Sequence, residues 1–195
     1  AHIEEISISP DGSRLAIYDP EMDRVRVWDL NCLSEITLDA NFGLVGVWYP
    51  DSIRMLVGRV GMYKAGRPVV TLYIVDLNTL EIMPLKALNN LDLDISQPVI
   101  SRDGNWIALS ARDAENVVTK QVWVMDADGN LVEVVTKESN YTHASVRWDP
   151  EGKYLVYQRF NVNSSDSLPE VWLWSREESS RWMLASDAAL PKWYP

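Results

Sequence analysis

The stretch SPDGSRLAI, from Ser9 to Ile17, places a Pro-Asp-Gly turn before an apolar segment, and the chain repeats this arrangement. Pro presets φ at one turn position, Gly supplies a positive φ at another, and Asp can bond its own backbone, so the pattern predicts a tight reversal between two strands. The further copies are YPDSIRMLV (Tyr49 to Val57), SRDGNWIAL (Ser101 to Leu109) and DPEGKYLVY (Asp149 to Tyr157). Because Ser52 stands where the other copies have Gly, we expect its turn to be the least regular.

Each turn joins the first two of four short extended segments. In the first unit these are IEEISI (Ile3 to Ile8), the apolar part of the opening stretch, RVRVWDL (Arg24 to Leu30) and EITL (Glu35 to Leu38). The third segments alternate apolar and polar residues, which is typical of half-buried strands. The unit recurs every 40 to 52 residues, measured from Pro10 through its equivalents to Pro195. Four strands at this period are typical of the blades of a β-propeller.

The sequence therefore predicts an all-β propeller of four-stranded antiparallel blades. The four expected blades cover about residues 3–40, 41–86, 93–137 and 141–187. Residues 190–195, LPKWYP, resemble VWYPDS and would be the first strand of a further blade. The chain would then be one propeller domain or part of a larger propeller, and the main alternative is a closed ring of four blades. An open arc would expose sheet edges, so we expect a partner chain or self-association.

The turn motif, the V/I-x-D end of the third strands and the polar turn after it together resemble the TolB-type WD-like propeller repeat. Related blades occur in the propellers of prolyl-oligopeptidase-type peptidases. The chain departs from the pattern at Ser52, at Arg102 in place of Pro, and at Ser175 in place of the third-strand Asp. The resemblance implies a periplasmic or extracellular protein with protein or peptide partners that enter at the channel mouth.

Composition excludes several classes of function. The 195 residues carry a formal net charge of −10, which argues against nucleic acid and against an anionic membrane surface. No apolar run is long enough to span a membrane. One cysteine, Cys32, and two histidines cannot form a transition-metal cluster of the usual kind, and no nucleotide-binding motif occurs, so we expect no cofactor.

The expected binding site lies on one face of the disc. The connections between second and third strands, and between blades, share that face, and they hold the length variation, which often marks the binding face of a repeat protein. The candidate partner-binding residues on these loops and strand ends are Tyr63, Lys64, Arg67, Arg112, Asp113, His143, Arg159, Asn161 and Asp166. For His143 a buried structural role is the alternative. The nine tryptophans lie mostly within strands, so we expect them to form blade-to-blade core.

These features predict a non-catalytic binding or scaffold propeller that contacts proteins or peptides through its long loops. The alternative is an accessory propeller that gates substrate access to a peptidase whose catalytic domain lies outside this chain. An enzyme using loop carboxylates such as Asp19, Asp113 or Asp166, and a purely structural assembly piece, are the remaining hypotheses. No Ser-His-Asp arrangement or G-x-S-x-G elbow supports catalysis in this chain.

Overall fold

The computed structural model describes residues 6–19, 21–22, 24–36, 38, 42, 44–88, 90–115, 119–130, 132–164 and 166–193. Within these residues, sixteen strands form four antiparallel sheets of four strands each. Sheet 1 contains β1 (Ile6–Ile8), β2 (Arg14–Asp19), β3 (Arg24–Asp29) and β4 (Ser34–Ile36); sheet 2 contains β5 (Leu44–Trp48), β6 (Arg54–Lys64), β7 (Arg67–Asp76) and β8 (Ile82–Pro84). Sheet 3 contains β9 (Leu93–Ile100), β10 (Trp106–Asp113), β11 (Gln121–Asp126) and β12 (Val132–Val134); sheet 4 contains β13 (Tyr141–Trp148), β14 (Tyr154–Asn161), β15 (Glu170–Ser175) and β16 (Ser180–Ser186).

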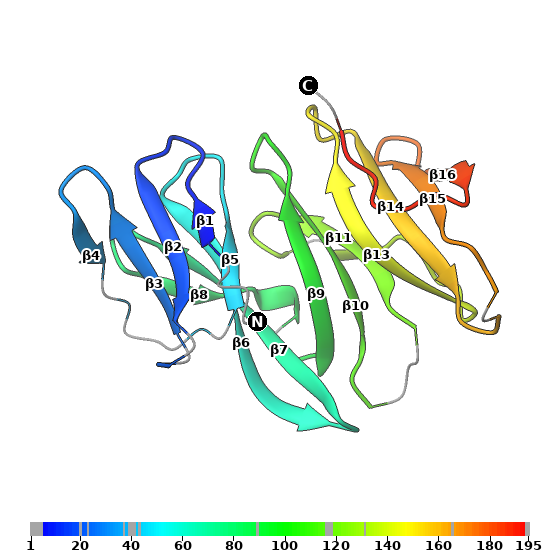
Figure 1. Cartoon of the computed structure of the whole chain (residues 1–195), viewed down its shortest axis with the longest axis horizontal. Coiled ribbons are helices and arrows are strands. Elements are labelled where there is room, and N and C mark those ends of the chain that lie inside the picture. Colours follow the sequence, from blue (N-terminus) through cyan, green and yellow to red (C-terminus); the bar gives the residue numbers. More distant parts are fainter. Residues whose placement is uncertain are drawn as a thin grey trace.

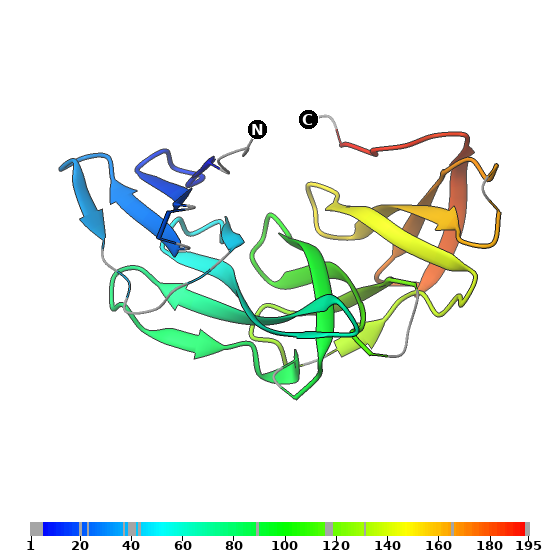
Figure 2. The same ribbon diagram turned by 60° about the horizontal axis from the view of Figure 1, so that its bottom comes forward.

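Each sheet is a meander whose strands pair in chain order, so the predicted all-β architecture of four-stranded antiparallel units is confirmed. The first strands of successive sheets contact one another, β1 with β5, β5 with β9 and β9 with β13. The four sheets stand side by side in an open arc, and the N- and C-terminal ends face each other across its gap (Figure 2). The alternative of a closed four-bladed ring is therefore wrong for this structure.

The hydrophobic core consists of three layers, one between each pair of neighbouring sheets. Val27 of sheet 1 packs with Trp48 and Val75 of sheet 2, and comparable apolar clusters fill the next two gaps. Trp148 and Trp174 belong to the layer between sheets 3 and 4, with ring centroids 6.3 Å apart. Trp48, Trp148 and Trp174 are buried, which confirms the core role expected for them, whereas Trp182 and Trp193 are 42% and 38% exposed, so the expectation is wrong for these two.

The short turns between first and second strands share one geometry. Gly12, Gly104 and Gly152 have φ of 75°, 75° and 67°, and each donates its N–H to the carbonyl three residues earlier. Ser52 adopts φ of 59° and makes the same bond to Tyr49 at 3.0 Å, so the expectation of an irregular turn is wrong. Its left-handed conformation is held by contacts with sheet 1, because its hydroxyl accepts the N–H of Asp11 at 3.1 Å.

The C-terminal segment runs beside sheet 4 without forming a strand over Leu190–Trp193. The Leu190 N–H donates to Oε1 of Gln158 at 3.2 Å, and Nε1 of Trp193 donates to the carbonyl of Arg147 at 3.4 Å. Residues 194 and 195 lie outside the described residues, so a further blade that begins at 190–195 stays a prediction. No helix in the described part of the chain is long and apolar enough to cross a membrane.

Candidate partner-binding face

The long connections gather on one face of the arc. In Figure 1 the short first-to-second-strand turns lie along the upper edge, while the β6–β7 hairpin and the β10–β11 and β14–β15 connections lie along the lower edge. We call this lower edge the loop face. Because successive strands of a meander run in opposite directions, the connections that enter β9 and β13 share it.

The β6–β7 hairpin reaches from sheet 2 onto the loops of sheet 3. Ala65 and Gly66 both have positive φ, 48° and 76°, as a tight two-residue hairpin turn requires. Nζ of Lys64 lies 2.5 Å from Oδ2 of Asp92 and 3.2 Å from Oε1 of Glu115. The predicted candidates Lys64 and Arg67 are thus used within the chain, since Nη1 of Arg67 also donates to the Ala114 carbonyl at 3.3 Å. Tyr63 is 70% exposed.

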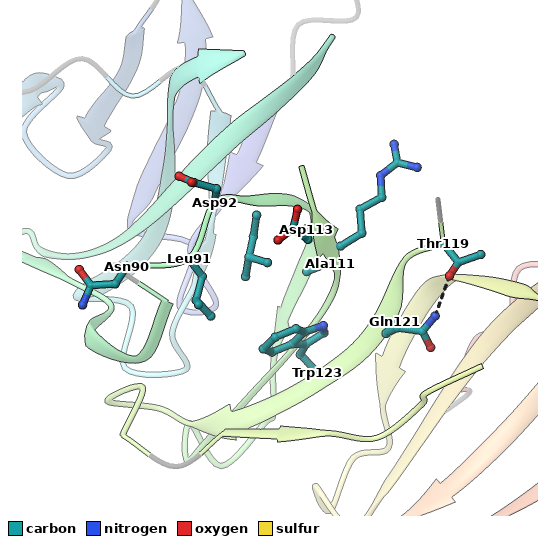
Figure 3. Close-up of a pocket in the computed structure, with 10 residues that line it drawn as sticks. Asn90, Leu91, Asp92, Ala111, Asp113, Thr119, Gln121 and Trp123 are labelled. Carbon is teal, nitrogen blue, oxygen red and sulfur yellow. Dashed lines mark hydrogen bonds between the residues drawn. The ribbon is translucent and has the colours of Figure 1, made fainter. Parts of the chain in front are cut away.

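A pocket of about 370 Å³ opens beside this hairpin, between the segment that enters β9 and strands β10 and β11 (Figure 3). Its apolar wall consists of Leu91, Leu93, Ala111 and Trp123, and its volume lies in the range of small-ligand sites. The polar residues that complete the lining are Asn90, Asp92, Arg112, Asp113, Thr119 and Gln121. Two predicted candidates, Arg112 and Asp113, are therefore part of this pocket.

Two buried polar atoms of the pocket residues have no hydrogen-bond partner among the described residues: Nε1 of Trp123 and Oε1 of Gln121. The Gln121 amide is oriented by its surroundings, because its Nε2 donates to the Glu138 carbonyl at 2.9 Å and to Oγ1 of Thr119 at 3.1 Å. A backbone carbonyl can only accept, so Oε1 is the atom left without a partner. An unpaired buried group costs about 1–3 kcal/mol. Nε1 of Trp48 and Nε1 of Trp148 also have no partner among the described residues, so the distinguishing feature of this pocket is that an unpaired donor and an unpaired acceptor belong to the same lining.

The equivalent pair in sheet 4 is fully satisfied. Trp172 and Glu170 occupy in β15 the register positions that Trp123 and Gln121 occupy in β11. There Nε1 of Trp172 donates to Oε2 of Glu170 at 2.7 Å. In sheet 3 the Gln121 side chain is held by other acceptors, so the indole N–H of Trp123 remains available. Both atoms are shielded from solvent, so a ligand would reach them only after the side chains that cover them had moved.

The charges beside the pocket are largely neutralised within the chain. Asp94 is buried and accepts bonds from Nε of Arg112 at 2.8 Å and Nζ of Lys120 at 2.9 Å. Burial opposes ionisation of Asp94, but the bonds and charges of Lys120 and Arg112 outweigh it and hold the pKa of this carboxyl below its usual range. Asp113 lies exposed at the rim, where its Oδ1 accepts the N–H of Glu115 at 2.8 Å.

The remaining predicted candidates lie around sheet 4, away from the pocket. Arg159 lies between the rings of Tyr141 and Trp172 and pairs with Glu170 at 2.7 Å. Oδ1 of Asn161 accepts the N–H of Asn163 at 2.9 Å. Asp166 is exposed on the β14–β15 connection. The prediction thus named two separate clusters, of which only the one around the hairpin adjoins the pocket.

His143 does not reach an open channel mouth, because it is only 1% exposed. Its Nδ1 donates to the Lys120 carbonyl at 2.9 Å, while Nε2 lies 3.5 Å from Oε2 of Glu138. Burial, together with the positive charges of Arg159 and Arg181, lowers the pKa of His143 despite the Lys120 bond and the Glu138 charge. The alternative of a structural histidine therefore describes this residue, and a direct contact with a partner does not.

The sequence prediction missed Leu91, Gln121 and Trp123. The sequence did contain one relevant difference between the repeats: β11 has Gln121 two residues before Trp123, whereas β15 has Glu170 two residues before Trp172. Whether the side chain at that position accepts the indole N–H depends on its rotation, and for Gln121 the rotation is set by Thr119 and the Glu138 carbonyl.

Comparison with known proteins identifies the fold of the chain but assigns it to no family. No family model matches the chain, and no curated protein matches it. Among solved structures, the oligogalacturonate lyase of Vibrio parahaemolyticus matches with a TM-score of 0.68 and 16% identity over 93% of this chain and 52% of that protein. A prolyl endopeptidase matches with 0.68 and 13% identity over 94% and 28%, and the β-propeller domain of the Trilobed protease of Pyrococcus furiosus with 0.59 and 14% over 92% and 57%.

The class of the chain is therefore a β-propeller, and its predicted likeness to the propellers of peptidases is confirmed at the level of the fold. At these identities the likeness extends to the fold alone. The chain spans about half the length of the oligogalacturonate lyases that it matches.

Proposed function

We propose that this propeller is a non-catalytic binding module that takes an extended peptide segment of a partner protein into the loop-face pocket. The observation that carries the proposal is that two buried polar groups of β11, the indole N–H of Trp123 and Oε1 of Gln121, have no hydrogen-bond partner among the described residues. The satisfied pair in β15 supports a specific role, because the same fold position need not leave these groups without partners.

A peptide backbone can supply the hydrogen-bond partners that Trp123 and Gln121 lack. Each amide offers one acceptor and one donor, which would complement the indole N–H and the Gln121 oxygen. The two groups come from residues i and i+2 of one strand, so they lie on one side of it about two strand residues apart, a spacing that an extended ligand also has. Leu91, Leu93 and the Trp123 ring would cover an apolar ligand side chain.

The charge of the chain indicates which peptides the pocket would favour. Asp113 lies at the exposed rim of the pocket, and the chain as a whole carries a net charge of −10, while the other charged lining residues, Asp92 and Arg112, are paired with Lys64 and Asp94. A peptide with an apolar residue beside Lys or Arg would therefore be favoured over an acidic one, since complementary charge speeds and orients association.

Selection from a random displayed peptide library, followed by fluorescence anisotropy with the enriched peptides, tests this proposal. Trp123→Phe removes the N–H and keeps an aromatic ring, and Gln121→Leu removes the acceptor with little change in volume. Each should weaken binding by about tenfold, because an unpaired ligand amide costs about 1–3 kcal/mol. Trp182→Phe, at a 42% exposed position of β16, is the matched control and should bind like the wild type. Peptides that bind all four chains equally would contradict the proposal, as would enrichment of acidic sequences.

An accessory role in a peptidase is the second candidate, and it is favoured by the prolyl endopeptidase and Trilobed protease structures among those that this chain resembles. In that role the same pocket would hold substrate peptides before cleavage elsewhere. Joining the chain to a peptidase domain of that kind would then change cleavage of selected peptides, and the Trp123→Phe substitution would reverse the change.

A further inference from the structure

A second pocket, of about 420 Å³, opens at the ends of the first strands of sheets 2, 3 and 4. Its apolar wall includes Val47 of β5, and Val99 and Ile100 of β9. Its two cationic residues are Arg102, in the turn after β9, and Arg147 of β13. The turns at these strand ends lie along the upper edge of Figure 1, on the opposite side of the arc from the loop face. Sheet 3 has a neighbouring sheet on both sides, so the pocket lies within the arc rather than at one of its open ends.

Both arginines of this pocket depart from the repeat. Arg147 occupies in β13 the register position that Val47 and Val99 occupy in β5 and β9. Arg102 stands where the other three turns of this kind have proline. The fold is therefore built elsewhere in the chain without a cation at either position. The two departures fall in different sheets and nevertheless line the same pocket, which favours a role for them as a pair.

The positive charge of the pocket is only partly offset by its own lining. The Arg102 guanidinium makes no hydrogen bond or ion pair with the described residues, and that of Arg147 donates only to the Val146 carbonyl among them, at 2.7 Å. Asp149 is the acidic residue of the lining, and its carboxylate accepts three backbone N–H groups that follow it in the chain, at 3.2, 2.7 and 2.7 Å. Two positive charges and one negative charge leave a surplus of one positive charge.

We propose that this pocket binds a small monocarboxylate with an apolar body, held by hydrogen bonds from Arg102 and Arg147. The planar donor set of a guanidinium matches a carboxylate, and one such anion neutralises the surplus charge. Val47, Val99 and Ile100 would cover the apolar body, and the volume lies in the range of small-ligand sites. A dianion such as phosphate exceeds the surplus charge of the lining, and the net charge of −10 on the chain opposes it further.

Titration of the 195-residue chain with benzoate, followed in the ¹H–¹⁵N spectrum of the tryptophan indoles, tests this proposal. Trp148 and Trp193 line the pocket, so their signals should move, while the Trp123 signal in the loop-face pocket should stay in place. Benzamide has nearly the same shape without the charge, and it should bind at least about tenfold more weakly than benzoate. Inorganic phosphate should also bind more weakly than benzoate.

Two substitutions test the arginines directly. Arg102→Gln and Arg147→Gln should each weaken benzoate binding by at least about tenfold, because each removes a charged donor. Lys137→Gln, at an exposed position between β12 and β13, changes the net charge by the same amount and is the matched control. It should bind benzoate like the wild type. Both arginines are exposed, so circular dichroism of their variants should match that of the wild type, which separates loss of binding from loss of folding.

Four results would overturn the proposal: no binding of benzoate, equal binding of benzoate and benzamide, phosphate binding as tight as that of benzoate, or arginine variants that bind like the wild type. A shift of the Trp123 signal alone would place benzoate in the loop-face pocket and would also overturn it. The peptide-binding proposal is scored separately, by anisotropy with Trp123→Phe and Gln121→Leu. Either proposal can therefore fail while the other stands.

Discussion

Arg159→Lys should destabilise the fold even though it keeps the positive charge. The guanidinium carbon of Arg159 lies 3.9 Å from the ring centroid of Tyr141 and 4.0 Å from that of Trp172. Its Nε donates to Oε2 of Glu170 at 2.7 Å, and the same oxygen accepts the Trp172 indole. Burial alone would raise the pKa of Glu170. The bonds from Trp172 and Arg159 and the charge of Arg159 outweigh burial, so the net effect lowers the pKa and the carboxylate is ionised and paired at neutral pH.

The expected loss follows from these contacts. A planar guanidinium between two rings contributes about 0.5–2 kcal/mol per ring, and a lysine ammonium keeps only part of that attraction. A hydrogen bond to a charged group contributes about 1.5–3 kcal/mol before solvent screening, and the Arg159 and Glu170 side chains are 14% and 23% exposed. Arg159→Lys keeps the charge but loses the planar set of donors, so it should lower the free energy of unfolding by about 2 kcal/mol. For a chain of this length that corresponds to a fall in Tm of about 4–8 °C.

Urea denaturation and thermal melts of the wild type and of Arg159→Lys measure this loss of stability. Arg102→Lys, at an exposed arginine, is the control and should change stability by less than about 0.5 kcal/mol. Combining Arg159→Lys with Glu170→Gln should give a coupling energy of about 1 kcal/mol. If Arg159→Lys were as stable as the wild type yet lost peptide binding, Arg159 would be a ligand contact, and its assignment to packing would be refuted.

Three further predictions rest on single contacts. Because the pKa of buried His143 is lowered from 6.5, the unfolded chain takes up a proton first as the pH falls below 6.5; stability should be full above that pH and decline below it, and urea midpoints of His143→Asn should show a smaller acid loss. Gly46→Ala should cost about 2–3 kcal/mol in urea denaturation, because its Cβ would lie 2.2 Å from the Leu56 carbonyl oxygen, and an unchanged midpoint would contradict that clash. Tyr49→Phe should cost about 1–1.5 kcal/mol in thermal melts, because the buried hydroxyl donates to the Ala127 carbonyl at 3.0 Å, and full stability would mean that this link between sheets 2 and 3 is without effect.

The architecture was predictable because it depends on local, repeated signals. A Pro-Asp-Gly turn and alternating strands specify each meander, and the repetition specifies the stacking. Ser52 shows the limit of that reasoning, since residue type alone suggested a poor turn. Contacts with Asp11 of the neighbouring sheet hold the serine in the left-handed region, and no local pattern contains them.

The binding face was predictable only in outline. Loop length pointed to the face that carries the β6–β7 hairpin and the pocket, but the charged residues chosen there, such as Lys64 and Arg112, are paired with carboxylates of the same chain. The groups that distinguish the pocket are Trp123 and Gln121, and they lie in a strand. Their unpaired state depends on the Glu138 carbonyl and Thr119, which approach Gln121 only in the folded chain.

The most direct test of the central claim, that the loop-face pocket binds a peptide, is a two-dimensional ¹H–¹⁵N spectrum of the tryptophan indoles during titration with a selected peptide. The chain has nine tryptophans, and single Trp→Phe variants assign their signals. The account predicts that the Trp123 indole proton moves most and shifts downfield as it gains an acceptor, while the Trp28 and Trp182 signals stay in place. A Trp123 signal that remains fixed while the peptide binds would contradict it.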